Sequence, residues 1–251
     1  MSHIPDPVLT DYFLNYLSAP LVWYGIEPKP IDAALMTGLI ERYPRVWLGR
    51  DRNAQTDDQE DRRAVERYLT EHAFKLDEQT YDNWARLLQF SAAGSVAEDI
   101  TPSQALGDMT LERVRLGIER RPVGGQPVVE PLNDGAVRAQ SGDTLQVGLT
   151  WRADQIPQAN YTVFLQLLDG ASQVVAQRDR WPGDGLYPTA ALAAGQVITD
   201  QVALPLDVPP GPYRLIAGLY RNDVEGLPRL SGPGGDSVLL GEVIVLEPKS
   251  N

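Results

Sequence analysis

The chain has 251 residues, a hydrophobic fraction of 43% and a net charge of −12, which predict a packed core in one large domain or two ordinary ones. The negative charge argues against a nucleic-acid partner or an anionic membrane surface, because both need a basic face. The absence of cysteine excludes disulfides, thiolate zinc sites and cysteine nucleophiles. With His3 and His72 as the only histidines, a His-rich metal site is excluded, and a Ser-His-Asp triad would have to use His72.

The sequence shows no membrane-spanning or leader segment. No apolar run reaches the roughly 20 residues needed to cross a bilayer, so we expect no direct membrane insertion of this segment. Residues 1–6 have neither a basic n-region nor an apolar h-region. We therefore expect a cytoplasmic protein if Met1 is the native start, or otherwise a soluble piece of something larger.

Residues 1–105 alternate between helical and strand patterns. Helical periodicity follows three helix-starting positions: Asp6-Pro7, Pro30 and Asp58. Short apolar strands are expected at residues 21–24, 45–49 and 84–90. This alternation predicts a small α/β domain with a mostly parallel sheet, half of a Rossmann-like fold.

Residues 91–107 read as a linker, and residues 106–251 read as an all-β domain. Short runs of β-branched and aromatic residues are separated there by Gly, Pro, Asp or Asn, which mark turns. The expected strands are 111–118, 128–131, 136–139, 145–151, 161–168, 173–181, 197–206, 213–220 and 238–246. About seven to nine strands in this length predict an antiparallel β-sandwich, Ig-like or jelly-roll-like. The predicted fold class is therefore α+β with two domains.

Two local motifs are interpreted as structural. The acidic segment 51–61 lacks the central glycine of a calcium loop and has Arg62 where the final glutamate would stand. The glycine-rich segment 232–236 lacks the Lys and Ser/Thr of a phosphate loop, and a hairpin connection explains it better. We therefore predict no metal, nucleotide or other cofactor.

A cluster of polar and aromatic residues precedes and enters the long loop 182–195. Trp and Tyr at the rim of a sandwich can stack on a sugar face while Asp and Arg bind its hydroxyls. The candidate ligand-binding residues are Arg178, Asp179, Trp181, Asp184 and Tyr187. The alternative is that Trp181 and Tyr187 only pin the loop onto the sandwich.

No local motif identifies catalytic residues. Asp179 and Asp200 lie on predicted strands that flank the loop and are a candidate carboxylate pair for a glycoside hydrolase. The alternative is that Asp179 pairs with Arg178 or Arg180 on a solvated face.

Parts of the sequence resemble a known family. Residues 161–169 and 211–220, with Pro188-Thr189, Gly195 and Asp200 between them, resemble the soluble C-terminal region of large bacterial membrane proteins similar to family-39 (protein mannosyltransferase-like) glycosyltransferases. Residues 44–48 and 65–69 are similar to the α/β segment before that sandwich. In the family, the catalytic carboxylates lie in the membrane part. The resemblance therefore implies an accessory, extracytoplasmic, membrane-attached region.

Three hypotheses follow. The first is a non-catalytic accessory region of a membrane glycosyltransferase-like protein, which contacts glycan, another protein or the membrane part of its own chain. The second is a free-standing protein-interaction scaffold. The third is a glycoside hydrolase-like enzyme that uses paired acids.

Overall fold

The computed structural model describes residues 33–51, 59–81, 85–92, 98–120, 128–130 and 136–247. The helix expected after Asp6, the strand expected at 21–24 and most of the acidic segment 51–61 lie outside these residues. Within them the protein is mostly β, with α2 and α3 as its α-helices.

The N-terminal part contains two helices and three strands. Its elements are α2 (Ala33–Arg42), β1 (Arg45–Asp51), α3 (Gln59–His72), β2 (Phe74–Tyr81) and β3 (Ala85–Ser91). The expected strands at 45–49 and 84–90 are present as β1 and β3, and helices follow Pro30 and Asp58 as expected. Strand β2 was not expected, because its sequence, FKLDEQTY, does not alternate regularly between apolar and polar residues.

The predicted parallel, half Rossmann-like sheet is wrong. Strand β3 lies between β1 and β2 and is antiparallel to both. The short β2–β3 connection explains this arrangement, because a tight link joins antiparallel strands whereas parallel neighbours need a long crossover. The sheet does not end at β2, since Lys75 pairs in parallel with Val202 of a strand far along the chain.

The rest of the described chain is built of strands and two short 3₁₀ helices. The strands are β4 (Glu98–Ile100), β5 (Gln104–Leu106), β6 (Met109–Arg120), β7 (Val128–Glu130), β8 (Ala136–Gln140), β9 (Thr144–Ala153), β10 (Tyr161–Leu168), β11 (Val174–Arg180), β12 (Val197–Pro205), β13 (Gly211–Arg221) and β14 (Val238–Leu246). The 3₁₀ helices are η1 (Pro182–Gly185) and η2 (Thr189–Ala191).

These strands form two mixed sheets. The nine-stranded sheet has the order β1-β3-β2-β12-β9-β6-β4, with β5 and β7 also paired to β6, and the five-stranded sheet has the order β11-β10-β13-β14-β8. Each sheet contains one parallel pairing, β2–β12 in the first and β8–β14 in the second. The predicted fold class, an α/β domain followed by a purely antiparallel sandwich, is therefore wrong. The division at residue 105 stays a prediction.

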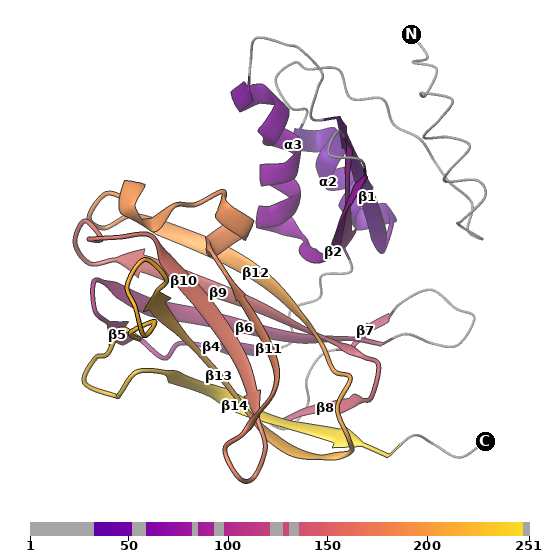
Figure 1. Ribbon diagram of the computed structural model, residues 1–251. Coiled ribbons are helices and arrows are strands. Elements are labelled where there is room, and N and C mark those ends of the chain that lie inside the picture. Colours follow the sequence, from indigo (N-terminus) through magenta and orange to yellow (C-terminus); the bar gives the residue numbers. More distant parts are fainter. Residues whose placement is uncertain are drawn as a thin grey trace, which may run out of the picture.

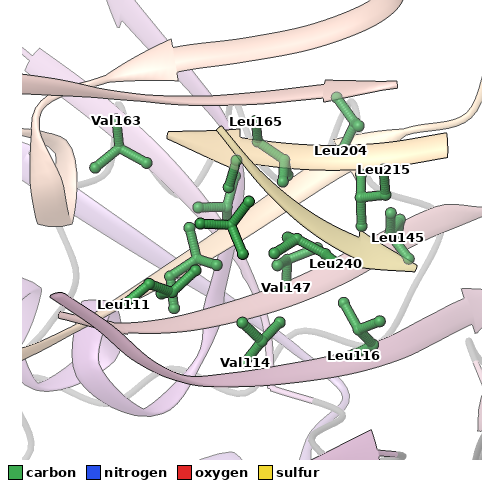
Figure 2. Close-up of a cluster of buried hydrophobic side chains, with 14 of the residues drawn as sticks. Leu111, Val114, Leu116, Leu145, Val147, Val163, Leu165, Leu204, Leu215 and Leu240 are labelled. Carbon is green, nitrogen blue, oxygen red and sulfur yellow. The ribbon is translucent and has the colours of Figure 1, made fainter. Parts of the chain in front are cut away.

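The main apolar core lies between the two sheets. Leu145, Val147 and Leu149 of β9 alternate along their strand and are buried against Val163 and Leu165 of β10. Figure 2 shows these inward rows meeting Leu215 and Leu240 from the neighbouring strands. Residues two apart in a strand share a face, so each strand contributes one apolar row to this core.

A separate, smaller core packs the two helices against the N-terminal strands. It contains Met36 and Leu39 of α2, Leu69 of α3, and Leu88 and Phe90 of β3. In Figure 1 these elements lie beside the larger β body, and the loop after β11 extends toward α3. The two apolar cores are therefore separate clusters.

Candidate functional site

The loop that follows β11 has an unusual backbone. Gly183, Asp184 and Gly185 are consecutive and have φ angles of 60°, 53° and 84°, in the left-handed region. This conformation costs an L-residue roughly 1–2 kcal/mol, and Asp tolerates it better than most because its short polar side chain bonds locally. A Cβ on Gly183 would lie 2.6 Å from the Tyr187 ring, so a glycine is required there.

Strand β11 is an edge strand with two inward-pointing arginines. Arg178 and Arg180 pair with Leu165 and Val163, whose side chains belong to the core. Inward-pointing charges are one way in which natural sheets prevent an edge strand from pairing with another chain. They also require acceptors inside the protein, because a buried charge without a partner is costly.

Arg180 finds its acceptors on the facing sheet and on the loop. Its Nη2 lies 2.8 Å from Asp200 Oδ1 and donates to the Gln201 carbonyl at 2.6 Å. Its Nη1 lies 2.8 Å from Asp184 Oδ2. Asp200 is fully buried and also accepts a hydrogen bond from the Gly183 N–H at 2.9 Å. One guanidinium thus ties β11 to β12 and to the left-handed turn.

The same turn is tied to the N-terminal part. Asp184 Oδ2 lies 2.9 Å from the buried Lys75 Nζ, which is 2.5 Å from Glu78 Oε2. Glu78 Oε1 then accepts from Arg86 Nε at 2.5 Å, and Arg86 is 3.4 Å from Glu66 of α3. Charges alternate in sign along this chain of contacts, so each group is neutralised by its neighbours. We call the set Glu66, Lys75, Glu78, Arg86, Arg180, Asp184 and Asp200 the junction network.

Burial and ion pairing act in opposite directions on its carboxylates. Burial disfavours ionisation of Asp184, but Arg180 and Lys75 outweigh it and hold the pKa of that carboxyl below its usual value. Burial raises the pKa of Asp200, and the attraction of Arg180 offsets this only in part. The hydrogen bond from Arg86 lowers the pKa of Glu78 from 4.5 to about 2, against the effect of burial.

Tyr187 and Thr189 fix the remainder of the loop. The Tyr187 hydroxyl donates to Glu71 of α3, and its ring packs against the main core. Burial and the Glu71 charge raise the pKa of Tyr187, so it stays a neutral donor. The fully buried Thr189 hydroxyl accepts from Tyr161 N–H at 2.7 Å and donates to the Ala159 carbonyl at 2.9 Å.

The structure separates the predicted ligand-binding residues into three groups. Asp184 and Tyr187 are used in contacts within the protein, as described above. Asp179 is exposed on the opposite face of β11. Partial desolvation raises the pKa of its carboxyl, and the interactions with Tyr220 and Arg229 oppose this shift. Arg178 is half-buried on the inward face of β11, and Trp181 directly follows this strand and is 37% exposed beside Gly185.

The carboxylate pair considered for a hydrolase is not brought together. Asp200 points into the protein and binds Arg180, whereas Asp179 lies on the other face of β11. The expected pairing of Asp179 with a neighbouring arginine is also absent among the ion pairs of the described residues. Sequence reasoning missed Lys75 and Glu78 altogether. The signal that was available for Arg180 and Asp200 is a charge at an inward position of an otherwise apolar strand row.

The described residues contain no group of three or more His, Asp or Glu side chains placed to hold a metal ion. None of the described helices is long and apolar enough to span a bilayer.

Comparisons with known proteins do not assign the chain to a family. No protein-family model matches the chain, and no curated protein matches it. Among solved structures, the C-terminal domain of Wzt is 12% identical with a TM-score of 0.34, covering 59% of this chain and 83% of that one. An endonuclease/exonuclease/phosphatase from Beutenbergia cavernae is 13% identical with a TM-score of 0.22, covering 68% of this chain and 34% of that one. Likeness at this level carries no argument about function.

Asp200→Leu should destabilise the protein by about 3 kcal/mol or more, because the buried Arg180 then loses its fully buried partner. The double variant Arg180→Met/Asp200→Leu should recover much of that loss, since it removes both charges from the core. The measurement is the free energy of unfolding from urea denaturation of each single variant and the double variant. Asp223→Asn, which breaks the exposed pair Arg221–Asp223, is the control and should leave the midpoint unchanged. Strictly additive costs in the double variant would show that the pair is not coupled.

Acid should weaken the junction network through Glu78. Its pKa is about 2 in the folded protein against an ordinary value of 4.5, so its contribution is complete above pH 4.5. That contribution is lost as the pH falls from 4.5 toward 2. Stability measured across this range should therefore fall more steeply in the wild type than in Glu78→Gln. Parallel curves for the two proteins would contradict the assignment.

Proposed function

We propose that this chain is a non-catalytic accessory region of a membrane glycosyltransferase-like protein and that it binds glycan at the rim of the β body. The site is formed by Arg178, Trp181 and the turn 183–185, which we call the rim site. The observation that carries the proposal is an exposed Trp181 on a turn that the junction network holds in place.

A rigid aromatic surface is what sugar stacking requires. The Trp181 ring lies against Gly185, with its Cε3 3.9 Å from the position that a Cβ there would occupy. The turn beneath it is fixed by Arg180 and Lys75 through Asp184. Because the indole is positioned before a ligand arrives, less conformational entropy is lost on binding. An aromatic ring with one apolar face open also suits the apolar face of a sugar.

The state of the carboxylates supports binding rather than catalysis. A general acid or base must contact the substrate and either donate a proton to it or accept one from it. Asp184 is paired with two cations and Asp200 is fully buried, so both carboxylates are engaged in contacts within the protein. Asp179 lies on the other face of the strand.

The membrane attachment and the extracytoplasmic location rest on the resemblance of residues 161–169 and 211–220 to glycosyltransferase-associated regions. If this part of the proposal is right, the gene should encode several apolar segments of roughly 20 residues ahead of the present chain.

Glycan-array binding followed by titration should identify sugars that bind the wild type and that quench its tryptophan fluorescence. Trp181→Ala should weaken binding about ten-fold, the equivalent of roughly 1.4 kcal/mol of lost stacking. Val197→Ala removes an exposed apolar side chain elsewhere, 49% exposed, and should bind like the wild type. A flat response across all glycans, unchanged in Trp181→Ala, would remove the proposal.

A further inference from the structure

We propose that the glycan bound at the rim site is acidic and that its carboxylate pairs with Arg178. This inference rests on the proposed function and adds the chemical class of the ligand. The argument comes from the hydrogen-bonding state of one arginine.

Arg178 is an arginine without an acceptor in the described structure. It is half-buried on the inward side of the edge strand β11. No hydrogen bond or ion pair joins its guanidinium to any residue that the structure describes. A guanidinium carries five N–H donors and stays charged, so the half-buried Arg178 has donors that an acceptor from outside the protein can use.

The carboxylates around Arg178 are already occupied. Asp184 is bound by Arg180 and Lys75, and Asp200 by Arg180 and the Gly183 N–H. Asp77 of β2 accepts from the Glu78 N–H at 2.8 Å and from the Gln79 amide at 3.2 Å. Their charges act on Arg178 from a distance, but none of them is paired with it.

The contrast with Arg180 on the same strand face shows what Arg178 lacks. Arg180 binds two carboxylates and a carbonyl. Burial and the neighbouring Arg180 charge lower the pKa of Arg178, so its guanidinium stays charged but is less stabilised here than in water. An anionic ligand would compensate both effects. The position therefore favours a carboxylate from outside the protein.

Geometry and Trp181 favour a sugar acid as that ligand. A guanidinium and a carboxylate fit through two parallel hydrogen bonds, a match that a neutral hydroxyl does not offer. Residues 178 and 181 are separated by roughly 10 Å along an extended chain, about the span of one or two sugar rings. Because β11 is an edge strand, a sugar chain lying along its free edge could stack one ring on Trp181 and present a carboxylate to Arg178 on the inward face. The net charge of −12 opposes this at long range, but physiological salt screens it beyond about 8 Å.

The test compares polygalacturonate, a uronic-acid polymer, with the same polymer after chemical reduction of its carboxyl groups, both at 0.15 M salt. The wild type should bind the acidic polymer at least ten-fold more tightly than the reduced one. Arg178→Met should lose about ten- to hundred-fold in affinity for the acidic polymer, as expected for a hydrogen-bonded charge pair. Arg214→Met, which removes an exposed arginine on β13, should bind like the wild type.

Stability separates a binding role from a structural one. Because Arg178 has no partner to lose, Arg178→Met should unfold at the same or a higher temperature while it loses the acidic polymer. A marked drop in unfolding temperature would overturn the inference, since it would show an internal partner. Equal binding of the acidic and reduced polymers by all variants would overturn it as well and leave the proposed function standing. Binding of no glycan at all would overturn both.

Discussion

The ion pairs of Arg180 are the contacts on which the rest of this structure depends. A single guanidinium bonds to Asp200 on the facing sheet and to Asp184 on the turn, and Asp184 passes the contact on to Lys75. These contacts cross from the five-stranded sheet to the nine-stranded sheet and from there to the N-terminal part. The left-handed turn is stable because its one non-glycine residue is held by two cations.

The junction between the two parts is polar almost throughout. The main core and the N-terminal core are separate clusters. Between them, Arg45 donates to the fully buried Glu119 at 2.8 Å, and the Gln146 amide donates to the Ser91 hydroxyl at 2.9 Å. A polar interface of this kind adds little net stability, since ion pairing is offset by desolvation, but it permits few alternative arrangements. This polar interface therefore fixes the position of the loop that follows β11. That loop carries Trp181, the exposed tryptophan of the rim site.

Local features of the sequence predicted most of the longer strands, but β4 and β5 lie in the segment 91–107 that was expected to be a linker. Strands β10 and β14 have the bounds expected from their alternation and their flanking turns. Strand pairing was predicted poorly, because it depends on residues distant in sequence. Strand β2 was missed because Lys75 and Glu78 face charged partners rather than an apolar layer. The antiparallel order of the N-terminal strands followed from the short β2–β3 connection, which is visible only once β2 is recognised as a strand.

The candidate site shows the same limit. Trp181 and Arg178 were identified because charged and aromatic residues cluster at the end of a strand. Asp184 and Tyr187 belong to that cluster in the sequence, but their partners, Lys75 and Glu71, lie more than a hundred residues earlier in the chain. No local sequence pattern reveals which residues of such a cluster have hydrogen-bond or ion-pair partners elsewhere in the protein. The residue left without an internal acceptor is found only when the partners of all the others are known.

We infer that the junction network holds the loop of residues 181–187 in a single conformation. Hydrogen-exchange mass spectrometry of the wild type and of Lys75→Met tests it most directly, because Lys75 binds the loop through Asp184. The account predicts faster exchange of residues 181–187 in the variant, with the buried strand β10 unchanged. Equal exchange of the loop in both proteins would contradict it.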